Sequence, residues 1–356
     1  MMIATPSFDF LTAATVDYLP QALATLRSAR CQGLDGTHFF FAIDAPPPTV
    51  AALRELLMDE GWLKIFGPHD LGAGRDTFLR AFAYFGPIEM CCLAKYVGIS
   101  HVQSMRGAAD CCVFADADVM FFGGLRESLA ELSGTAFLLT PHQFGPSTDA
   151  AEHEYLQSGW INAGFIAVRK SNGDTQNILG WLVDRITRRG FFAPMLGLYC
   201  DQSWLSLLPL AFCGRVALST HPGMNVAYWN LPERDLSEQG GHFLANDRPL
   251  VFFHFSGFDG LQRNRLSKHA DVIVIPGTAL ADICAQYQIE LAAAEQMRPA
   301  LAGLQTLPCS SDSLQERIDK GSAINGIDIG SPGATRGIFT RIGGKIDSAL
   351  CRLNGR

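Results

Sequence analysis

Residues 110–122 read Asp-Cys-Cys-Val-Phe-Ala-Asp-Ala-Asp-Val-Met-Phe-Phe, an apolar stretch interrupted by two carboxylates. The run Cys112 to Ala115 is too short for a buried helix and is typical of a central β-strand. It leads into Asp116 and Asp118, and a spacing of two in extended chain directs both side chains to one side. The apolar flanks favour this interpretation over a surface turn at a strand end, where Asp is also common.

Two like charges held together away from water are costly unless a positive charge lies between them. A hard divalent cation with oxygen ligands meets this need, and Mg²⁺ or Mn²⁺ can also bridge to a diphosphate. In open α/β sheets, ligands bind at the carboxyl ends of the strands. Asp116 and Asp118 are therefore predicted to form a metal-dependent binding site.

The composition excludes several classes of protein. The 356 residues are 48% hydrophobic and 18% charged, as in a globular protein with a large core, and the net charge of −7 does not favour nucleic acid as a partner. The first residues lack the pattern of a signal peptide, and no run of eighteen apolar residues predicts a membrane span. The adjacent pairs Cys91-Cys92 and Cys111-Cys112 suit neither a disulfide framework nor a zinc site. They are interpreted as reduced core residues of a cytoplasmic protein.

Apolar runs at 8–15, 38–43 and 63–66 alternate with helical patterns at 19–29 and 50–58. This alternation predicts an α/β fold with a mostly parallel central sheet and helices on both faces. Further helices are expected at 76–84 and 88–103, and further strands at 136–140 and 159–169. The polar segment 148–157 is expected to be a mobile loop, and Gly72-Ala73-Gly74 only a loop, because it is a fragment of a dinucleotide fingerprint.

Three further residues have an ordinary interpretation when each is considered alone. Lys95 and Glu89 lie off the apolar face of their helix, where a lysine is usually solvated. Asp201 is placed to cap the helix that follows it. His254, in an apolar strand, is more often a satisfied core residue than a ligand.

In order along the chain, however, these pieces resemble the GT-A glycosyltransferases, and within them glycosyltransferase family 8, the glycogenin and lipopolysaccharide galactosyltransferase type. The resemblance covers about residues 8–260. It rests on Thr12-Ala13-Ala14-Thr15 with Tyr18, on Lys95 followed by Asp116-Ala117-Asp118, on Asn162-Ala163-Gly164, on Asp201-Gln202 and on His254-Phe255-Ser256-Gly257. A bacterial group of glycosyltransferase-like proteins is most similar, since it shares Thr140-Pro141-His142 and Asn225-Val226-Ala227-Tyr228-Trp229-Asn230-Leu231.

The resemblance implies a GT-A (nucleotide-diphospho-sugar transferase) domain over 1–275. The residue pattern beyond it predicts a helix packed on or beside this domain at 276–300, and a polar, Gly-rich, partly disordered tail at 301–356. The resemblance also implies a role for each matching residue. The implied metal ligands are Asp116, Asp118 and His254, for Mn²⁺ or Mg²⁺. The implied catalytic residues are Asn162, Asp201 and Gln202. The implied nucleotide-sugar contacts are Ala13, Ala14, Thr15, Tyr18, Lys95, Asp116, Ala117, Ser256 and Gly257, and the acceptor is expected near His142, Asn225, Tyr228 and Trp229.

The expected activity is transfer of a sugar from a nucleotide sugar, with UDP as the expected nucleotide, to a glycan, lipid-linked or other acceptor, with retention of configuration. The expected location is the cytoplasm, including its boundary at the inner face of the membrane, where a lipid-linked acceptor would be found. Two alternatives remain open. One is a haloacid-dehalogenase-like phosphatase with Asp116 as its nucleophile, although in that class the Asp-x-Asp strand usually opens the domain. The other is a non-catalytic module that binds sugar nucleotides.

Overall fold

The computed structural model describes residues 7–170, 172–260 and 262–327. A seven-stranded sheet forms its centre, in the order β10-β6-β7-β4-β1-β2-β3. Its strands are β1 (Phe8–Ala14), β2 (His38–Ala42), β3 (Leu63–Phe66), β4 (Cys111–Ala115), β6 (Phe137–Pro141), β7 (Ile161–Arg169) and β10 (Val216–Leu218). The paired strands are parallel except where β7 runs antiparallel to both β4 and β6. The predicted α/β fold with a mostly parallel sheet is confirmed.

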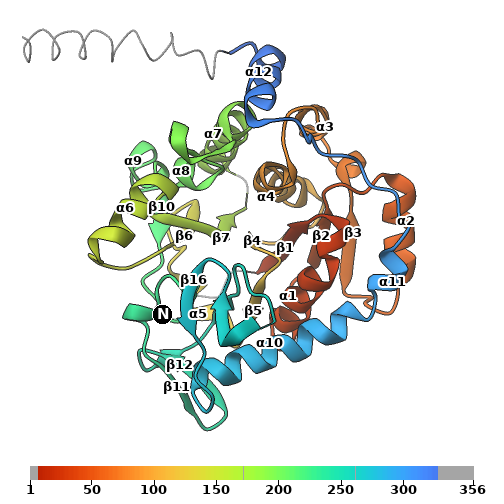
Figure 1. Cartoon of the computed structure of the whole chain (residues 1–356). Coiled ribbons are helices and arrows are strands. Elements are labelled where there is room, and N and C mark those ends of the chain that lie inside the picture. Colours follow the sequence, from red (N-terminus) through yellow and green to blue (C-terminus); the bar gives the residue numbers. More distant parts are fainter. Residues whose placement is uncertain (1–6, 171, 261, 328–356) are drawn as a thin grey trace, which may run out of the picture.

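Helices cover both faces of this sheet (Figure 1). On one face lie α1 (Leu19–Cys31), α2 (Pro47–Leu56) and α5 (Arg126–Ala130), and on the other α3 (Arg75–Ala81), α4 (Pro87–Ser104) and α7 (Gly173–Arg189). Successive strand residues point to opposite faces, so Phe40 packs with α1 and α2 whereas Phe39 and Phe41 pack with α3 and α4. Because both faces are buried, the strands are mostly apolar, as the sequence indicated.

The remaining strands and helices are short, apart from the helices α6, α10 and α12. The strands are β5 (Val119–Phe121), β8 (Phe192–Ala193), β9 (Leu198–Tyr199), β11 (Leu236–Gln239), β12 (His242–Ala245), β13 (Arg248–Pro249), β14 (Phe252–His254), β15 (Arg265–Ser267) and β16 (Ala270–Ile273). The helices are α6 (Asp149–Ser158), α8 (Gln202–Leu205), α9 (Leu208–Ala211), α10 (Ala279–Glu295), α11 (Arg298–Leu301) and α12 (Leu314–Asn325).

The two carboxylates after β4 do not continue the strand, which corrects the prediction of an extended chain. Residues 117 and 118 form a turn, and β5 then leaves the central sheet to pair with β14. The hydroxyl of the buried Thr25 lies 2.8 Å from the carbonyl oxygen of Ala117 and 2.7 Å from that of Val119. The apolar residues before and after the two carboxylates thus belong to two different strands, β4 and β5. The turn between these strands is held by the buried hydroxyl of Thr25.

The segment predicted as a polar, mobile loop is the helix α6. Thr148 caps it, since its side-chain oxygen accepts a hydrogen bond from the backbone N–H of Ala151. Tyr155 and Ser158 are the buried residues on its inner side. So small an apolar face gives little periodicity to detect, which is why the sequence pattern did not predict this helix.

Helix α4 is buried on nearly all sides. Glu89 and Lys95 are therefore buried, although the periodicity of the helix predicted that they would be solvated. Their exposed fractions are 3% and 5%. The carboxylate of Glu89 accepts hydrogen bonds from Arg317 of α12, at 2.8 Å, and from the backbone N–H of Phe192, at 3.2 Å. An ion pair therefore joins α4 to the last described helix.

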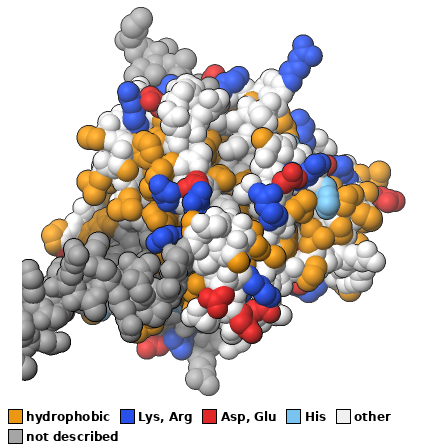
Figure 2. Space-filling model, turned by 90° about the horizontal axis from the view of Figure 1, so that it is seen from above, with side chains coloured by type: hydrophobic (Ala, Val, Ile, Leu, Met, Phe, Trp, Pro, Cys, Tyr) orange, Lys and Arg blue, Asp and Glu red, His pale blue; other side chains and the backbone are white. Residues whose placement is uncertain are grey.

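The sequence pattern did not predict α12. Ser313 and Glu316 form a capping box at its start, and Ile318 is buried in the same core as α4 and α7. The rest of the predicted tail, residues 328–356, lies outside the described residues. Within the described ranges, no helix has the length and apolar composition needed to cross a bilayer. Figure 2 shows charges of both signs mixed with hydrophobic side chains on the face seen from above.

Replacing Arg317 with Ala should lower the free energy of unfolding by about 3 kcal/mol, because it leaves the Glu89 carboxylate buried without its partner. Lys320→Ala removes an exposed ion pair of the same helix, with Asp312, and should cost less than about 1 kcal/mol. Urea unfolding of both variants measures the difference. Equal losses would show that α12 does not depend on the buried pair.

Candidate functional site

A cavity of about 460 Å³ opens where the β4–β5 turn, the start of β7 and the end of β14 meet. Helices α4, α6 and α8 complete its walls. The lining residues include most of those singled out in the sequence: Lys95, Asp116, Asp118, His142, Asn162, Asp201, Gln202, Tyr228, Trp229, His254 and Ser256. The structure thus brings together residues that are up to 161 positions apart in the sequence.

Asp116, Asp118 and His254 form the candidate metal group. Each offers one ligand atom, and these three atoms lie within 4.8 Å of one another. His254 reaches the turn because β14 pairs with β5 in the register that puts His254 opposite Val119. Two carboxylate oxygens and one imidazole nitrogen suit Mn²⁺ well and Mg²⁺ acceptably, so the residues present fit a divalent cation.

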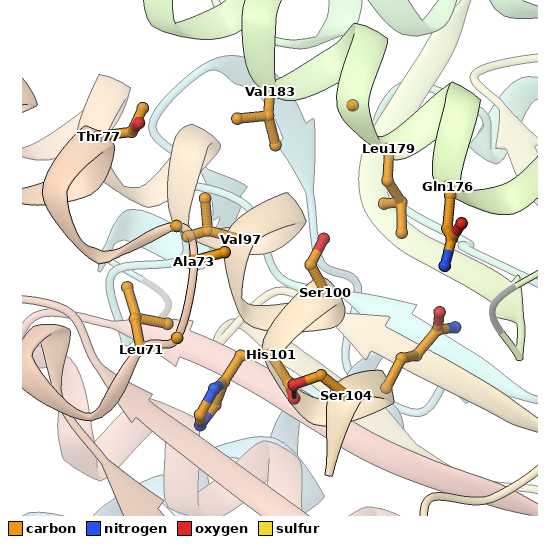
Figure 3. Close-up of a pocket in the computed structure, with 14 residues that line it drawn as sticks. Leu71, Ala73, Thr77, Val97, Ser100, His101, Ser104, Gln176, Leu179 and Val183 are labelled. Carbon is orange, nitrogen blue, oxygen red and sulfur yellow. Dashed lines mark hydrogen bonds between the residues drawn. The ribbon is translucent and has the colours of Figure 1, made fainter.

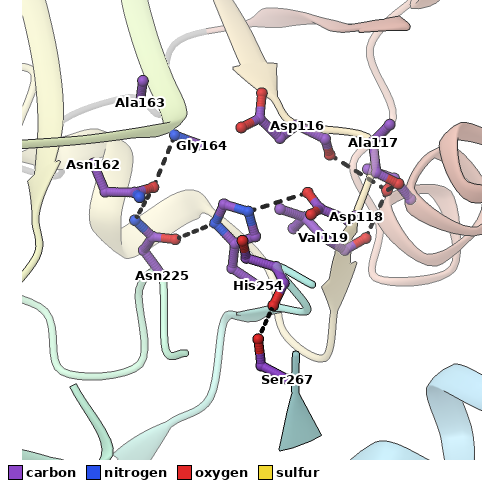
Figure 4. Close-up of polar contacts among 12 residues, drawn as sticks. Asp116, Ala117, Asp118, Val119, Asn162, Ala163, Gly164, Asn225, His254 and Ser267 are labelled. Carbon is purple, nitrogen blue, oxygen red and sulfur yellow. Dashed lines mark hydrogen bonds and ion pairs between the residues drawn. The ribbon is translucent and has the colours of Figure 1, made fainter. Parts of the chain in front are cut away.

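His254 and Asp118 pair directly. The Nε2 atom of His254 is 3.1 Å from Asp118 Oδ1 (Figure 4). Burial alone would lower the pKa of His254, but the neighbouring Asp118 raises it above its usual value. Burial would likewise raise the pKa of Asp118, yet the His254 imidazole holds it below its usual value. This pair shows that the pocket is built to compensate negative charge.

Lys95 extends from α4 to three oxygen acceptors. Its ammonium nitrogen is 3.0 Å from Asp116 Oδ1, 3.5 Å from Asp201 Oδ2 and 2.9 Å from the carbonyl oxygen of Ala163. Burial alone would lower the pKa of Lys95, but the two carboxylates raise it above its usual value. Since an ammonium group has three hydrogens, all three have acceptors within the protein.

Asp201 occupies the N-cap position of α8, but its side chain does not cap that helix. It is 2% exposed, and its Oδ2 accepts a hydrogen bond from the hydroxyl of Tyr96 at 3.0 Å as well as the contact with Lys95. The capping interpretation that helix logic favours is therefore wrong for the side chain. Tyr96, next to Lys95 on α4, is a site residue that the sequence reading missed, because a buried helical Tyr gives no distinctive signal.

Asn162 and Gln202, both expected to be catalytic, lie side by side. The amide nitrogen of Asn162 is 3.3 Å from Gln202 Oε1 and 3.3 Å from His142 Nε2. Gln202 Oε1 also accepts the backbone N–H of Ala163, and its amide nitrogen donates to the carbonyl oxygen of Ser158. Gln202 therefore retains one N–H that no residue of this network uses, which is a donor and not a nucleophile.

Gly164 is required by the same network. A Cβ atom at this position would lie 2.4 Å from His254 Cε1 and 2.7 Å from Asn162 Oδ1. The backbone of Gly164 therefore lies against the ring of the candidate metal ligand His254.

The residues expected on the acceptor side divide into two sets. His142, Tyr228 and Trp229 line the cavity, and His142 stacks on Tyr155 of α6 with ring centroids 5.1 Å apart. Asn225 lies behind this wall and is 0% exposed, so it cannot touch an acceptor. Aromatic faces suit the apolar faces of sugar rings. Tyr155 was the one aromatic residue of the segment taken for a loop.

The residues expected to hold the nucleoside are not at the cavity. Ala13 and Ala14 are buried at the end of β1, while Tyr18 is 54% exposed on η1 (Val16–Tyr18). None of Ala13, Ala14, Thr15, Tyr18, Ala117 and Gly257 is among the residues that line it. Their roles in nucleotide binding stay predictions.

A second cavity, of about 560 Å³, lies between α4, α7 and the loop at 72–74 (Figure 3). Leu71, Val97, Leu179 and Val183 form its apolar walls. Its described lining contains no Asp, Glu, Lys or Arg. The Gly72–Gly74 segment is a loop, as predicted, and the cavity beside it offers no charged group to a phosphate.

No protein-family model matches the chain. Two curated relatives from Bacillus subtilis (strain 168) are similar. "Uncharacterized protein YfnD" is 27% identical over 178 residues, which are 48% of this chain and 54% of the relative. "Uncharacterized protein YfnF" is 25% identical over 184 residues, or 51% of this chain and 60% of the relative. The matched region thus spans little more than half the length of these relatives.

Three solved structures are also similar. The galactosyltransferase LgtC, in complex with donor and acceptor sugar analogs, is 14% identical, with 82% of this chain and 99% of that chain covered and a TM-score of 0.49. The glycosyltransferase GlyE of Streptococcus pneumoniae is 12% identical, with 85% and 65% covered and a TM-score of 0.45. Mouse xyloside xylosyltransferase 1 is 12% identical, with 62% and 87% covered and a TM-score of 0.38. Since these TM-scores are below 0.5, the function proposed below rests on the sequence and the site.

Lys95→Met should destabilise the protein by roughly 3 kcal/mol or more, because Asp116 and Asp201 then share a buried site without a cation. Adding Asp201→Asn should recover part of that loss, since one of the two carboxylates is removed. Chemical unfolding of the single and double variants gives the coupling between Lys95 and Asp201. A double variant no more stable than Lys95→Met would disprove the coupling.

Stability should also fall in acid because of His142. Burial lowers the pKa of His142 to about 4, below its value in the unfolded chain. Between pH 6.5 and 4 the unfolded chain therefore binds a proton at His142 that the folded protein does not. The free energy of unfolding should be at its full value above pH 6.5 and should fall by up to ~3 kcal/mol as the pH approaches 4. His142→Phe keeps the aromatic stack but cannot be protonated. Urea unfolding between pH 7.5 and 4 should therefore show a smaller acid loss for this variant than for the natural protein.

Proposed function

We propose that this chain is a metal-dependent glycosyltransferase, related to glycosyltransferase family 8, that moves a sugar from a nucleoside-diphosphate sugar to an acceptor. The observation that carries the proposal is the convergence, in one cavity, of the Asp116–Asp118–His254 group and the buried Lys95–Asp201 pair. A bound Mn²⁺ or Mg²⁺ would neutralise the charge that develops on the departing diphosphate.

Lys95 acts by holding carboxylates rather than by binding phosphate. All three of its hydrogens have acceptors in the protein, so its positive charge fixes Asp116 and Asp201 and supports the diphosphate only through the local field. The resemblance implied that Lys95 contacts the donor directly. The contacts of its ammonium group support a narrower role, without such a contact.

The donor sugar is proposed to lie beside Asn162, Asp201 and Gln202. Asp201 is a poor nucleophile because it is 2% exposed and engaged by Lys95 and Tyr96. Gln202 is an amide, which is also a poor nucleophile. These two observations favour front-face substitution with retention, in which Gln202 donates its remaining N–H to the sugar or to the leaving oxygen.

The acceptor is proposed to be a glycan, including a lipid-linked glycan, that stacks on the aromatic wall. His142, Tyr155, Tyr228 and Trp229 supply that wall. UDP as the donor nucleotide and the cytoplasm, up to the inner membrane face, as the place of action remain part of this proposal. The phosphatase alternative has less support, since a phosphatase that uses Asp116 as nucleophile would have no need of the pairing between His254 and Asp118.

The deciding experiment is calorimetric titration with UDP, GDP and CDP in Mn²⁺, in Mg²⁺ and in chelator. We expect one nucleotide to bind, and binding to disappear with chelator. Asp118→Asn should weaken metal-dependent binding at least about tenfold, because it removes a charged metal ligand. Asp110→Asn, exposed at the other end of the same strand, is the matched control and should bind normally.

Sugars of the nucleotide that binds are then tested for hydrolysis and transfer. Release of nucleoside diphosphate from one of them supports a transferase, whereas binding without turnover of any sugar favours the non-catalytic module. If no nucleotide binds with either metal, the proposed function is wrong, and phosphate esters would be tested next.

A further inference from the structure

Asn225 lies behind the cavity wall and contacts two site residues, Asn162 and His254, as well as Thr140. It is 0% exposed and has a φ of +52°, a left-handed conformation that Asn adopts more readily than most residues. Its amide nitrogen is 2.9 Å from Thr140 Oγ1 and 2.9 Å from Asn162 Oδ1, and its Oδ1 is 3.2 Å from His254 Nδ1. Both ends of its amide are therefore engaged (Figure 4).

The orientation of this amide follows from a backbone group whose chemistry is unambiguous. The N–H of Gly164 can only donate, and at 2.8 Å it identifies the facing atom of Asn162 as the oxygen Oδ1. The Asn225 atom beside that oxygen must then be its nitrogen. The remaining atom of Asn225, its oxygen, faces His254 Nδ1, which must therefore carry a hydrogen.

The other end of the network agrees with this assignment. The N–H of Ala163 donates to Gln202 Oε1, while the carbonyl oxygen of Ser158 accepts from the Gln202 nitrogen. Gln202 thus presents its oxygen to the nitrogen of Asn162. Backbone groups at two separate points orient all three amides in the same sense.

Hydrogen bonds also hold the backbone of the loop 225–230, to which Asn225 belongs. Asn230 donates to the carbonyl oxygens of Asn225 and His142, and accepts the N–H of Ala227. The N–H of His254 in turn donates to the carbonyl oxygen of Val226 at 2.8 Å. Asn225 and His254 are therefore fixed relative to each other by main-chain as well as side-chain contacts.

We infer that Asn225 is a positioning residue that holds His254 in the Nδ1–H tautomer. In the structure, Nε2 of His254 lies 3.1 Å from Asp118 Oδ1 and is the donor of their ion pair. A divalent cation bound between the two carboxylates would take the place of that Nε2 hydrogen, while Asn225 keeps the hydrogen on Nδ1. Partners of this kind on the far side of a ligating histidine commonly set its tautomer and ring orientation. Asn225 thus acts on metal binding from behind the wall, not on the acceptor. This inference rests on the metal site of the proposed function.

Asn225→Gly tests this directly, because glycine accepts the left-handed backbone and removes only the amide. Its affinity for Mn²⁺, measured without nucleotide by the electron spin resonance of the free ion, should fall about 10- to 100-fold. Thr140→Val is the matched control. It removes one buried hydrogen bond of the same amide but leaves Gly164 and Asn162 to orient it, so its affinity should stay within about threefold of natural.

A second readout does not depend on how the variant folds. In the natural protein loaded with diamagnetic Mg²⁺, long-range ¹H–¹⁵N spectra should show hydrogen on Nδ1 of His254 and none on Nε2. Hydrogen on Nε2 would overturn the inference. So would Asn225→Gly binding Mn²⁺ as tightly as Thr140→Val.

The two proposals can fail separately. If the natural protein binds no Mn²⁺ at all, the metal site fails, and the role of Asn225 fails with it. If the natural protein binds Mn²⁺ and Asn225→Gly binds equally well, the metal site stands and only the role of Asn225 is refuted.

Discussion

A single buried ammonium group, that of Lys95, holds the candidate site together. Two carboxylates from distant parts of the chain, Asp116 and Asp201, approach this ammonium group, and it compensates the negative charge of both. The charge balance then extends outward, with Asp118 beside Asp116 and His254 beside Asp118. Asp116 and Asp118 are the two like charges that lie next to each other in this row, and a divalent cation bound between them would balance both.

The single antiparallel strand of the central sheet makes this arrangement possible. Because β7 runs against β4, the first residues of β7 lie at the sheet edge where β4 ends. In a parallel strand, those residues would lie at the opposite edge. Asn162 and Gly164 therefore meet the β4–β5 turn, and the same reversal brings Ala163 to Lys95 and Gln202. For this topological reason, Asn162 of the amide network on β7 lies beside the metal group on the β4–β5 turn.

The amide network gives the site directionality. Unlike a carboxylate, an amide has one donor end and one acceptor end, so a chain of them has a single low-energy sense once one member is fixed. Backbone groups of Ser158, Ala163 and Gly164 fix that sense. Because Asn225 bonds to both Asn162 and His254, this orientation also determines which atom of Asn225 faces His254. Within this network, Gln202 has one amide N–H without a partner, and Gln202 lines the same cavity as the aromatic residues Tyr155, Tyr228 and Trp229.

The sequence by itself determined the sheet, its first helices and the residue types of the site. Apolar runs and helical periods are local properties, so β1 to β4 and α1 to α4 were predictable within a few residues. The motif order likewise identified Asp116, Asp118, His254, Lys95, Asp201 and Gln202. Local patterns failed where few residues face the core, as in α6 and α12.

Only the tertiary structure decided what each of these side chains touches. Lys95 and Glu89 look solvated by periodicity, yet they are buried, because helix contacts from distant segments cover them. Asp201 looks like a cap but pairs with Lys95. Asn225 looks like a loop residue near the acceptor but lies behind His254. Hydrogen-bond partners that lie 29 to 228 positions away cannot be inferred from local spacing, since they depend on how strands and loops pack in three dimensions.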